Sequence, residues 1–363
     1  MAESTRQDPP RRPPSRHGAG ERLGTPWSGG RASAIAAERV LQLLSSSRYR
    51  KGSLEHMNFP RYRSHLLATL RRCTRAGAPV QLTLMAFPFK VPNRAKAGSR
   101  TLPDLAELTA VRWCQALGAR IAEIYTPGLR LEVIHDGALI AEVFGVGLAE
   151  VRAYEEYFGR LLHGAGAESV IRCHDFEALQ RRTGLDPSPA LDQLREEAAY
   201  WSRSSRDTPG WRACFSKSLG MLQLRDLSPR EAATLLRAAV RGALPPEYAP
   251  VEQRVHEAMT AYRVKNAIIH CFDPRAVAFP DAIHATTRVQ PGRLALWLVR
   301  RGSGLLPWHG VGAVDNAGRA RVTLAAQVEG RPDMRAVVLT GEDTPFCYAP
   351  VDARTDLAAL LPA

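Results

Sequence analysis

Residues 80–87 constrain the fold of this chain more than any other segment. The run VQLTLMAF first alternates apolar and polar side chains and then becomes apolar, as a strand does when it enters a protein interior. Helical spacing precedes this strand at residues 65–75 and follows it at residues 105–117, where Asp104 is a candidate N-cap. A strand enclosed by helices in this way indicates an α/β fold.

The rest of the chain extends the pattern. Further helices are predicted over residues 34–44, 148–162, 188–202, 228–242 and 247–265. Further strands are predicted over residues 121–125, 131–135, 138–143, 268–272, 294–299, 311–314, 321–328 and 335–339, with an Asp136-Gly137 turn joining the second of them to the third. We therefore expect a mixed sheet flanked by helices, with a Rossmann-like core and a more antiparallel C-terminal part.

Composition separates a tail from a folded part. Residues 1–31 are rich in Pro, Gly, Arg and Ser and are expected to be disordered, so that the folded domain spans residues 32–363. No apolar run approaches the roughly 18 residues that span a bilayer, and the N-terminus does not resemble a secretory signal. Six cysteines, none in a C-x-x-C pair, indicate reduced thiols and a cytoplasmic protein.

The chain is strongly basic, with a formal net charge of +13. Nucleic acid is one partner that such a charge suggests, but the arginines are scattered and no helix-turn-helix, zinc-finger or RNP motif is present. Nucleic-acid binding is therefore disfavoured. Cationic pockets also suit small phosphorylated substrates.

A basic loop follows the strand at 80–87 and is the first candidate site. Ligands of open α/β sheets bind at the carboxyl ends of the strands, and Lys90, Asn93 and Lys96 lie just beyond this one. Lys90 is favoured as an anion ligand, whereas for Lys96 and Arg94 a solvated loop charge is an equal alternative. The glycines of a P-loop are missing.

Two carboxylates in the next segment allow two interpretations. Asp104 and Glu107 lie one helical turn apart, so both could face one cleft. The same spacing is that of a capping box, which would make both residues structural. Spacing alone does not decide between these two interpretations.

Histidines supply the third candidate site. His309 follows Pro307 and Trp308 and precedes a glycine, and His284 lies three residues after Asp281. A carboxylate beside an imidazole raises its basicity, which suits a general base. Either histidine could instead be structural. The sequence contains no H-x-H or H-E-x-x-H pattern and no G-x-S-x-G elbow, so a metal centre and a serine hydrolase are both disfavoured.

Several of these segments together resemble the pyoverdine/dityrosine biosynthesis family, whose characterised bacterial members are isonitrile (isocyanide) synthases. The resemblance runs from about residue 32 to about residue 350 and is weakest over 175–245. The matching segments are FPFKVPN at 87–93 with Lys96 following, LPDLAE at 102–107, IYTPGLRLEVIHDG at 124–137, IHATT at 283–287 and PWHGVG at 307–312.

The resemblance implies a reaction and a set of roles. The amine of an amino acid would join the ketone of ribulose 5-phosphate, and cleavage of the sugar, a carbon–carbon lyase step without a cofactor, would leave the isonitrile. Lys90, Lys96 and Asn93 would hold the phosphate or sugar, or Lys90 would activate the ketone as an amine nucleophile. His309 and His284 would act as acid and base, with Asp281 orienting. Asp104 or Glu107 would hold the substrate amine, and Trp308 would contact substrate.

Two other functions are alternatives to isonitrile synthesis. A relative that N-formylates an amino acid would share the fold and the amine substrate, and its product would be a formamide. A non-catalytic protein could instead use the basic surface to bind nucleic acid or acidic partners, with affinity that falls in salt. No residue identifies the amino acid. The isonitrile reading also makes a downstream tailoring oxygenase a candidate partner.

Overall fold

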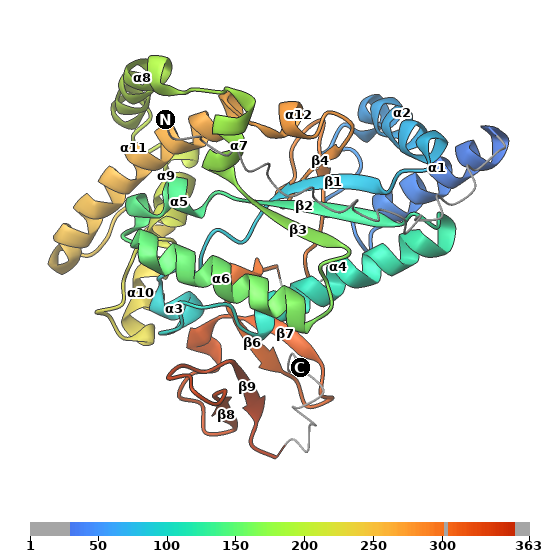
Figure 1. Cartoon of the computed structure of the whole chain (residues 1–363). Coiled ribbons are helices and arrows are strands. Elements are labelled where there is room, and N and C mark those ends of the chain that lie inside the picture. Colours follow the sequence, from blue (N-terminus) through green and yellow to red (C-terminus); the bar gives the residue numbers. More distant parts are fainter. Residues whose placement is uncertain (1–29, 301–303, 353–363) are drawn as a thin grey trace, which may run out of the picture.

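A parallel sheet forms the centre of the computed structural model, which describes residues 30–300 and 304–352 (Figure 1). Its five strands run in the order β3-β2-β1-β4-β5, and every pair is parallel. This is the Rossmann strand order, and it reverses between β1 and β4. The expected Rossmann-like core is confirmed. The strands are β1 (Val80–Met85), β2 (Leu129–His135), β3 (Ile171–Asp175), β4 (Ile283–Thr286) and β5 (Leu294–Ala295).

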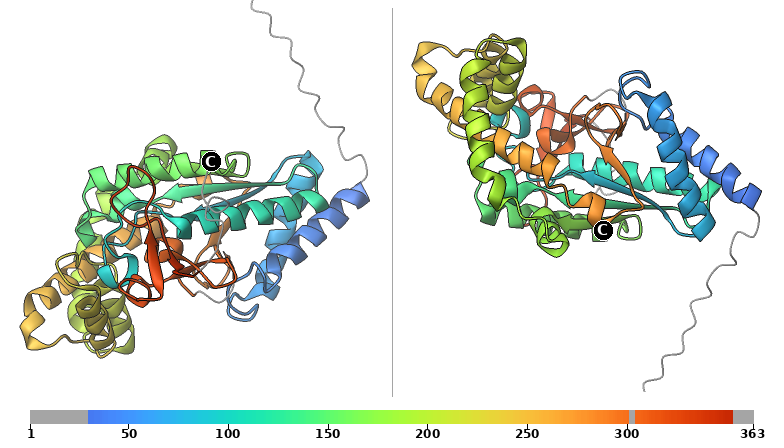
Figure 2. Two further views of the ribbon diagram at one scale, coloured as in Figure 1. Left: turned by 90° about the horizontal axis from the view of Figure 1, so that it is seen from below. Right: turned by 90° about the horizontal axis from the view of Figure 1, so that it is seen from above.

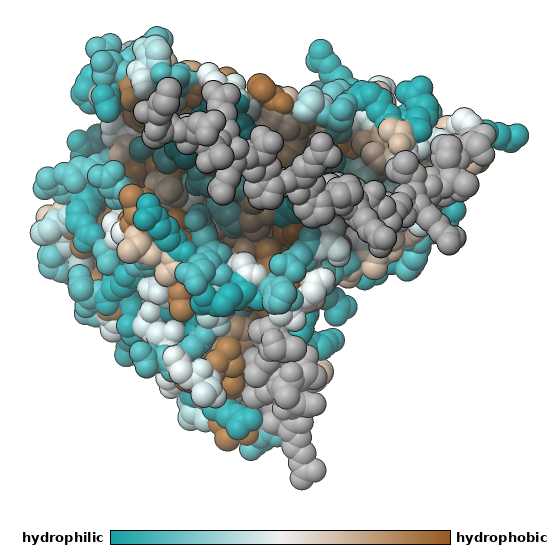
Figure 3. Space-filling view, in the orientation of Figure 1, coloured by the Kyte–Doolittle hydropathy of each residue, from teal (hydrophilic) through white to brown (hydrophobic). Residues whose placement is uncertain are grey.

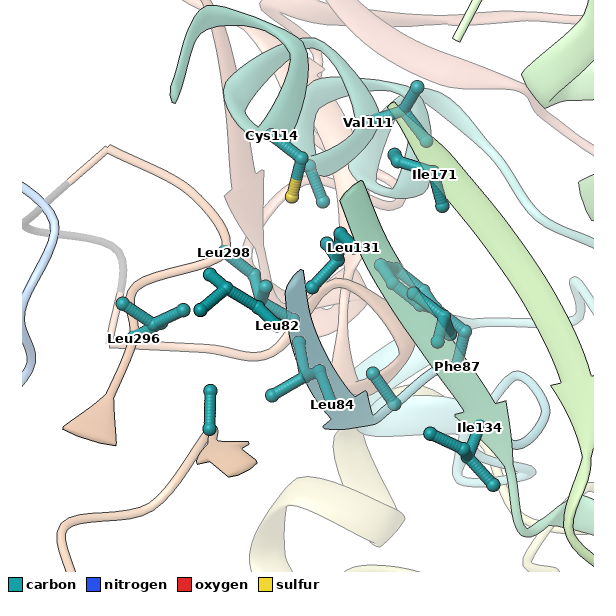
Figure 4. Close-up of a cluster of buried hydrophobic side chains, with 14 of the residues drawn as sticks. Leu82, Leu84, Phe87, Val111, Cys114, Leu131, Ile134, Ile171, Leu296 and Leu298 are labelled. Carbon is teal, nitrogen blue, oxygen red and sulfur yellow. The ribbon is translucent and has the colours of Figure 1, made fainter. Parts of the chain in front are cut away.

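Helices cover both faces of this sheet, which is why its strands are largely apolar. On one face, Leu82, Leu131 and Ile171 from neighbouring strands meet Val111 and Cys114 of a long helix (Figure 4). This face carries α4 (Leu105–Ile124) and α6 (Leu148–Gly164). The other carries α2 (Phe59–Ala76), α7 (Phe176–Thr183) and α12 (Arg275–Ala278), with α1 (Gly30–Ser45) packed on α2 (Figures 1 and 2).

A helical unit lies at the end of the sheet away from α1 and α2 (Figure 2). It has its own apolar core, in which Trp211 and Phe215 pack against Leu235 and Met259. Its helices are α8 (Leu191–Ser204), α9 (Pro209–Leu219), α10 (Pro229–Ala239) and α11 (Ala249–Cys271). Shorter helices elsewhere are α3 (Arg94–Ala97), α5 (Gly137–Ile140), η1 (Glu142–Phe144), η2 (Ser188–Ala190), η3 (Pro246–Tyr248), η4 (Pro307–His309) and η5 (Ala325–Gln327).

A second sheet completes the fold, in the order β7-β6-β9-β8. Its β6–β7 and β8–β9 pairs are antiparallel and its β6–β9 pair is parallel, so the expected antiparallel character of the C-terminal part is confirmed. The sheet packs against the first turn of α4 (Figure 1). Its strands are β6 (Val311–Val314), β7 (Ala320–Thr323), β8 (Met334–Val337) and β9 (Cys347–Pro350).

Several predicted strands are wrong. Residues 121–125 and 268–272 instead end α4 and α11, and residues 138–143 form α5 and η1. Short buried apolar runs look alike in helices and strands, so periodicity does not separate them. The predicted strand at 294–299 is reduced to two residues. The sequence does not predict strands β3, β4 and β9. Strand β3 lacks a continuous apolar pattern because it lies at the edge of the sheet, where Arg172 and Cys173 are exposed.

The first described helix begins close to the predicted start of the folded part. Residues 1–29 of the predicted tail lie outside the described residues, and α1 begins at Gly30, two residues before the predicted start of the folded part. Within 30–300 and 304–352, no helix combines the length and apolarity that a bilayer crossing requires. On the face shown in Figure 3 most side chains are hydrophilic, and apolar ones are seen mainly in recesses between helices.

Replacing Gly312 by alanine should destabilise the junction between α4 and the second sheet. A Cβ at this position would contact Leu105 and lie 2.8 Å from the Ala106 backbone nitrogen. We expect a loss of about 1–3 kcal/mol, typical of overpacking, measurable by chemical denaturation. Gly159→Ala is the control, because Gly159 lies in α6 with nothing within 4 Å of the added carbon, and it should be neutral or stabilising. Equal stability of the two variants would contradict this account.

Candidate active site

A cavity of about 350 Å³ lies at the carboxyl ends of β1, β2 and β4. It therefore lies at the point where the strand order reverses, the usual ligand position in open α/β sheets. Helix α11 and η4 complete its walls. Its apolar side chains are Met85, Ile140, Met221, Ile269, Leu306 and Trp308, and its polar ones include Asp136, Tyr262, Asn266, His270, Arg275, Arg288, Arg293 and His309.

Guanidinium groups give one part of the wall a positive charge. Arg275 is fixed by Asp273, which accepts its Nε at 2.9 Å and its Nη2 at 2.6 Å. Arg288 and Arg293 also line the cavity. Arginine binds carboxylate and phosphate groups in defined geometry, so this wall suits an anionic ligand.

Two lysines add to this charge beside the cavity. The Nζ of Lys217 lies 4.1 Å from the ring centre of Tyr262, a residue of the cavity wall. Burial, and next the charge of Arg288, lowers the pKa of Lys217 to about 7. Burial alone lowers the pKa of Lys96 to about 8. Lys96 passes across Gly220, where an added Cβ would lie 2.6 Å from its Nζ. Both lysines are thus poorly solvated cations that an anion would stabilise.

His309 faces the same cavity. Burial, followed by the charges of Lys96, Arg288 and Lys217, holds the pKa of His309 well below its usual range. The imidazole is therefore neutral near pH 7, and one of its ring nitrogens is free of a proton. Trp308 orders this segment, because its ring packs at 5.1 Å on Phe87 and at 6.0 Å on His309, centre to centre.

Lys90, Asp104 and Glu107 are not at the cavity but in a buried ion cluster. Lys90 Nζ lies 3.0 Å from Asp104 Oδ2 and 2.8 Å from Glu107 Oε2, and all three side chains are at most 1 % exposed. Asp104 and Glu107 form a capping box at the start of α4. The structural interpretation of the two carboxylates is the one observed, and Lys90 is closed off from any phosphate.

Around this cluster, the FPFKVPN segment acts as a support for the cavity. The backbone nitrogen of Val91 donates to Trp308 O at 2.9 Å, and Lys90 reaches Pro307 O at 3.4 Å. Asn93, expected at the sugar or phosphate, is buried; it caps α3 and donates to Leu219 O at 3.2 Å. These bonds hold η4 and the end of α9 against the loop, which brings His309, Lys96 and Lys217 together.

His284 and Asp281 do not form the expected pair. The Nδ1 of His284 lies 2.8 Å from Thr83 Oγ1, and His284 is not part of the cavity wall. Asp281 is 70 % exposed and pairs with Arg72 at 3.2 Å. The proposed orienting contact is therefore wrong, because β4 begins after Asp281 and directs the two side chains to different partners.

Sequence reasoning missed most of the cavity wall. Asp136 directly follows β2, whose end the sequence predicts correctly, and Arg288 lies two residues after β4, which the sequence does not predict. The rule that applies to the loop after β1 applies to both positions. His270 was assigned to a strand but lies in the last turn of α11. Lys217 lies in the helical unit, and nothing in its local sequence distinguishes it from a solvated lysine.

Comparison with known proteins finds a family model and several relatives that match this chain. The family model for pyoverdine/dityrosine biosynthesis proteins matches residues 70–207. An L-tyrosine isonitrile synthase from Xenorhabdus nematophila is 27% identical over 68% of this chain and 72% of its own. An L-tyrosine isonitrile synthase from Pseudomonas aeruginosa is 26% identical over 75% of this chain and 83% of its own.

A solved structure shares the architecture. The PvcA protein of Pseudomonas aeruginosa aligns with a TM-score of 0.62 at 22% identity, over 87% of this chain and 99% of that one. Its likeness shows the fold. The family model and the sequence relatives show that this chain is similar to pyoverdine/dityrosine biosynthesis proteins and to isonitrile synthases.

Proposed function

We propose that this protein is an isonitrile synthase that converts the α-amine of an L-amino acid to an isonitrile and takes the carbon from ribulose 5-phosphate. The observation that carries the proposal is the cationic cavity at the switch point of the sheet. Each substrate carries an anionic group, a phosphate in one and a carboxylate in the other, and the wall offers separate cationic side chains to the two groups. The names of the two tyrosine-specific relatives support the same chemistry.

The phosphate is assigned to Lys96, Lys217 and Arg288. These three lie close enough together that the charges of Lys96 and Arg288 both lower the pKa of Lys217. A phosphate dianion would relieve that repulsion. The amino-acid carboxylate is assigned to the wall formed by Arg275 and Arg293, and its side chain to the apolar surface that includes Met85, Ile269 and Trp308.

His309 is the proposed proton carrier for the later steps. Its neutral imidazole can remove a proton from carbon in the sugar-derived part and return it after carbon–carbon cleavage. Such steps transfer protons and break carbon–carbon bonds, so the proposed reaction belongs to the lyases. Of the residues expected from sequence, His309, Lys96 and Trp308 keep a place in the proposal.

Mass spectrometry of the products tests the proposal. The purified protein is incubated with ribulose 5-phosphate and each common L-amino acid in turn, tyrosine first. The expected product carries one more carbon and two fewer hydrogens than one of the amino acids. Addition of the elements of carbon monoxide would instead identify a formylating enzyme. No product with any amino acid, together with salt-sensitive binding of unrelated oligonucleotides, would favour a binding protein.

A further inference from the structure

Asp136 is a carboxylate that the fold presents to the cavity without using it structurally. Among the described residues of the cavity wall it is the only one with a carboxylate. It occupies the N-cap position of α5, yet its side chain makes no capping hydrogen bond. Arg275, the cation whose charge acts most strongly on Asp136, is already bound by Asp273 through several hydrogen bonds.

The backbone around Asp136 is fixed on both sides. His135 Nδ1 lies 2.8 Å from the carbonyl oxygen of Phe87, a residue held at a φ of 57°. A Cβ on Gly137 would collide with the carbonyl of Pro88 and lie 2.9 Å from Val151 Cγ1, so only glycine permits this approach. Positive φ at a bulky residue is costly and persists where the surroundings enforce it. The ends of β1 and β2 thus clamp Asp136 at the cavity.

We propose that Asp136 binds the α-ammonium group of the amino-acid substrate and removes its proton, which makes the amine nucleophilic. This inference rests on the proposed function and names the residue that starts the reaction. An ammonium ion is the part of the substrates that the cationic wall cannot hold. The other carboxylates considered for this role, Asp104 and Glu107, are sealed in the ion cluster with Lys90.

In the first step Asp136 takes up one proton and later returns it, so the carboxylate is restored. The carboxylate takes one proton from the ammonium, and the freed nitrogen lone pair attacks the ketone carbon of ribulose 5-phosphate. The carbonyl electron pair moves to oxygen, which receives the second nitrogen-bound proton through solvent. The protonated Asp136 then returns its proton to the hydroxyl group, which leaves as water while the nitrogen lone pair forms the protonated imine. Ammonium and ketone give protonated imine and water, with no oxidation or reduction.

The electrostatics of the site suit a group that both takes and returns a proton. The charged and titratable groups around Asp136 are Arg275, Lys217, Arg288 and Tyr262. Burial raises the pKa of Asp136 to about 6, against the lowering effects of its own backbone N–H and then of the three cations. A carboxylate of that strength is ionised at pH 7 and still a usable acid.

Substitution of Asp136 by asparagine tests the inference through binding as well as turnover. Wild-type protein should bind tyrosine more tightly than 3-(4-hydroxyphenyl)propionate, which lacks the amine, by about 10-fold or more, as a charge-assisted hydrogen bond predicts. Asp136→Asn should abolish that preference and leave the affinity for ribulose 5-phosphate within a few-fold. Asp192→Asn, at an exposed residue of α8, is the control and should behave as wild type.

Turnover gives the second readout. Asp136→Asn should lower kcat/KM by about 100-fold or more, the usual contribution of a general base. The wild-type rate should fall as the pH drops through about 6, and this acid limb should be absent in the variant. A variant that keeps the preference for the amine, or the wild-type acid limb, would overturn the inference. If the wild-type protein forms no isonitrile but still prefers the ligand with the amine, only the proposed function would be overturned.

Discussion

Lys90→Met should destabilise the folded protein by about 3–5 kcal/mol, the usual cost of removing one partner from a buried ion pair. The variant leaves Asp104 and Glu107 buried side by side without the ammonium group that both contact. Tyr154 also donates to Glu107 at 3.2 Å, which alone cannot compensate a buried charge. Urea denaturation at pH 7 measures the loss.

The pH dependence of that loss identifies its cause. Burial raises the pKa of Glu107 above its ordinary value of 4.5, and the charge of Lys90 opposes the shift. A carboxyl group with a raised folded pKa stabilises fully below its unfolded pKa and loses that contribution as the pH rises through the folded value. The pKa of Glu107 is raised to about 7, so the deficit of Lys90→Met should be smallest near pH 5, where Glu107 is protonated with or without Lys90, and should grow as the pH rises through about 7. Adding Glu107→Gln should recover part of it. A variant as stable as wild type at pH 7 would contradict the ion cluster.

Lys217→Met should lower kcat/KM for ribulose 5-phosphate by about 10- to 100-fold, the range expected when one charge-assisted hydrogen bond to a phosphate is lost. Lys96→Met should have an effect of the same size, and the affinity for the amino acid should change less. Lys265→Met is the control, because Lys265 lies on α11 but outside the wall of the central cavity. Equal losses in all three variants would contradict a phosphate site at Lys96 and Lys217.

Affinity for the phosphate should also weaken in alkaline solution. The pKa of Lys217 is lowered to about 7 and that of Lys96 to about 8. Both side chains lose their charge as the pH rises through these values, so the dissociation constant for ribulose 5-phosphate should increase between about pH 7 and pH 9. Isothermal titration should show a smaller pH effect in each lysine variant. A dissociation constant that is independent of pH over this range would argue against lysine contacts.

The sequence predicts the overall α/β architecture better than it predicts the individual strands and their order. The alternation of strand and helix around residues 80–87 indicates an α/β fold, and the predicted strand there is confirmed as β1. The order of the strands could not be predicted, because β3 and β4 are short and interrupted by polar residues such as His174 and His284. These side chains find partners in Glu132 and Thr83 on neighbouring strands, which no local pattern reveals.

The motifs of the sequence meet in space, but only part of their side chains line the cavity: Trp308 and His309 do, and Lys90, Asp104 and Glu107 do not. Lys90 in FPFKVPN, Asp104 in LPDLAE and Pro307 in PWHGVG do converge in space, but into the closed ion cluster beneath the cavity. In the sequence, a lysine that follows an apolar strand looks the same whether its ammonium group pairs with a buried carboxylate or binds a ligand. The choice between them depends on burial, and burial is set by the whole fold.

Chemical labelling of the lysines tests the central claim, that the substrates meet at the carboxyl ends of β1 and β4. The native protein is treated with an amine-specific acylating reagent at pH 8, with and without ribulose 5-phosphate, and peptides are quantified by mass spectrometry. Lys217 and Lys96 should label readily, because their lowered pKa values leave much of each amine neutral, and the sugar phosphate should protect both. Lys90 should stay unlabelled because it is fully buried. Labelling of Lys96 and Lys217 that is unchanged by saturating ribulose 5-phosphate would contradict the assignment of this cavity.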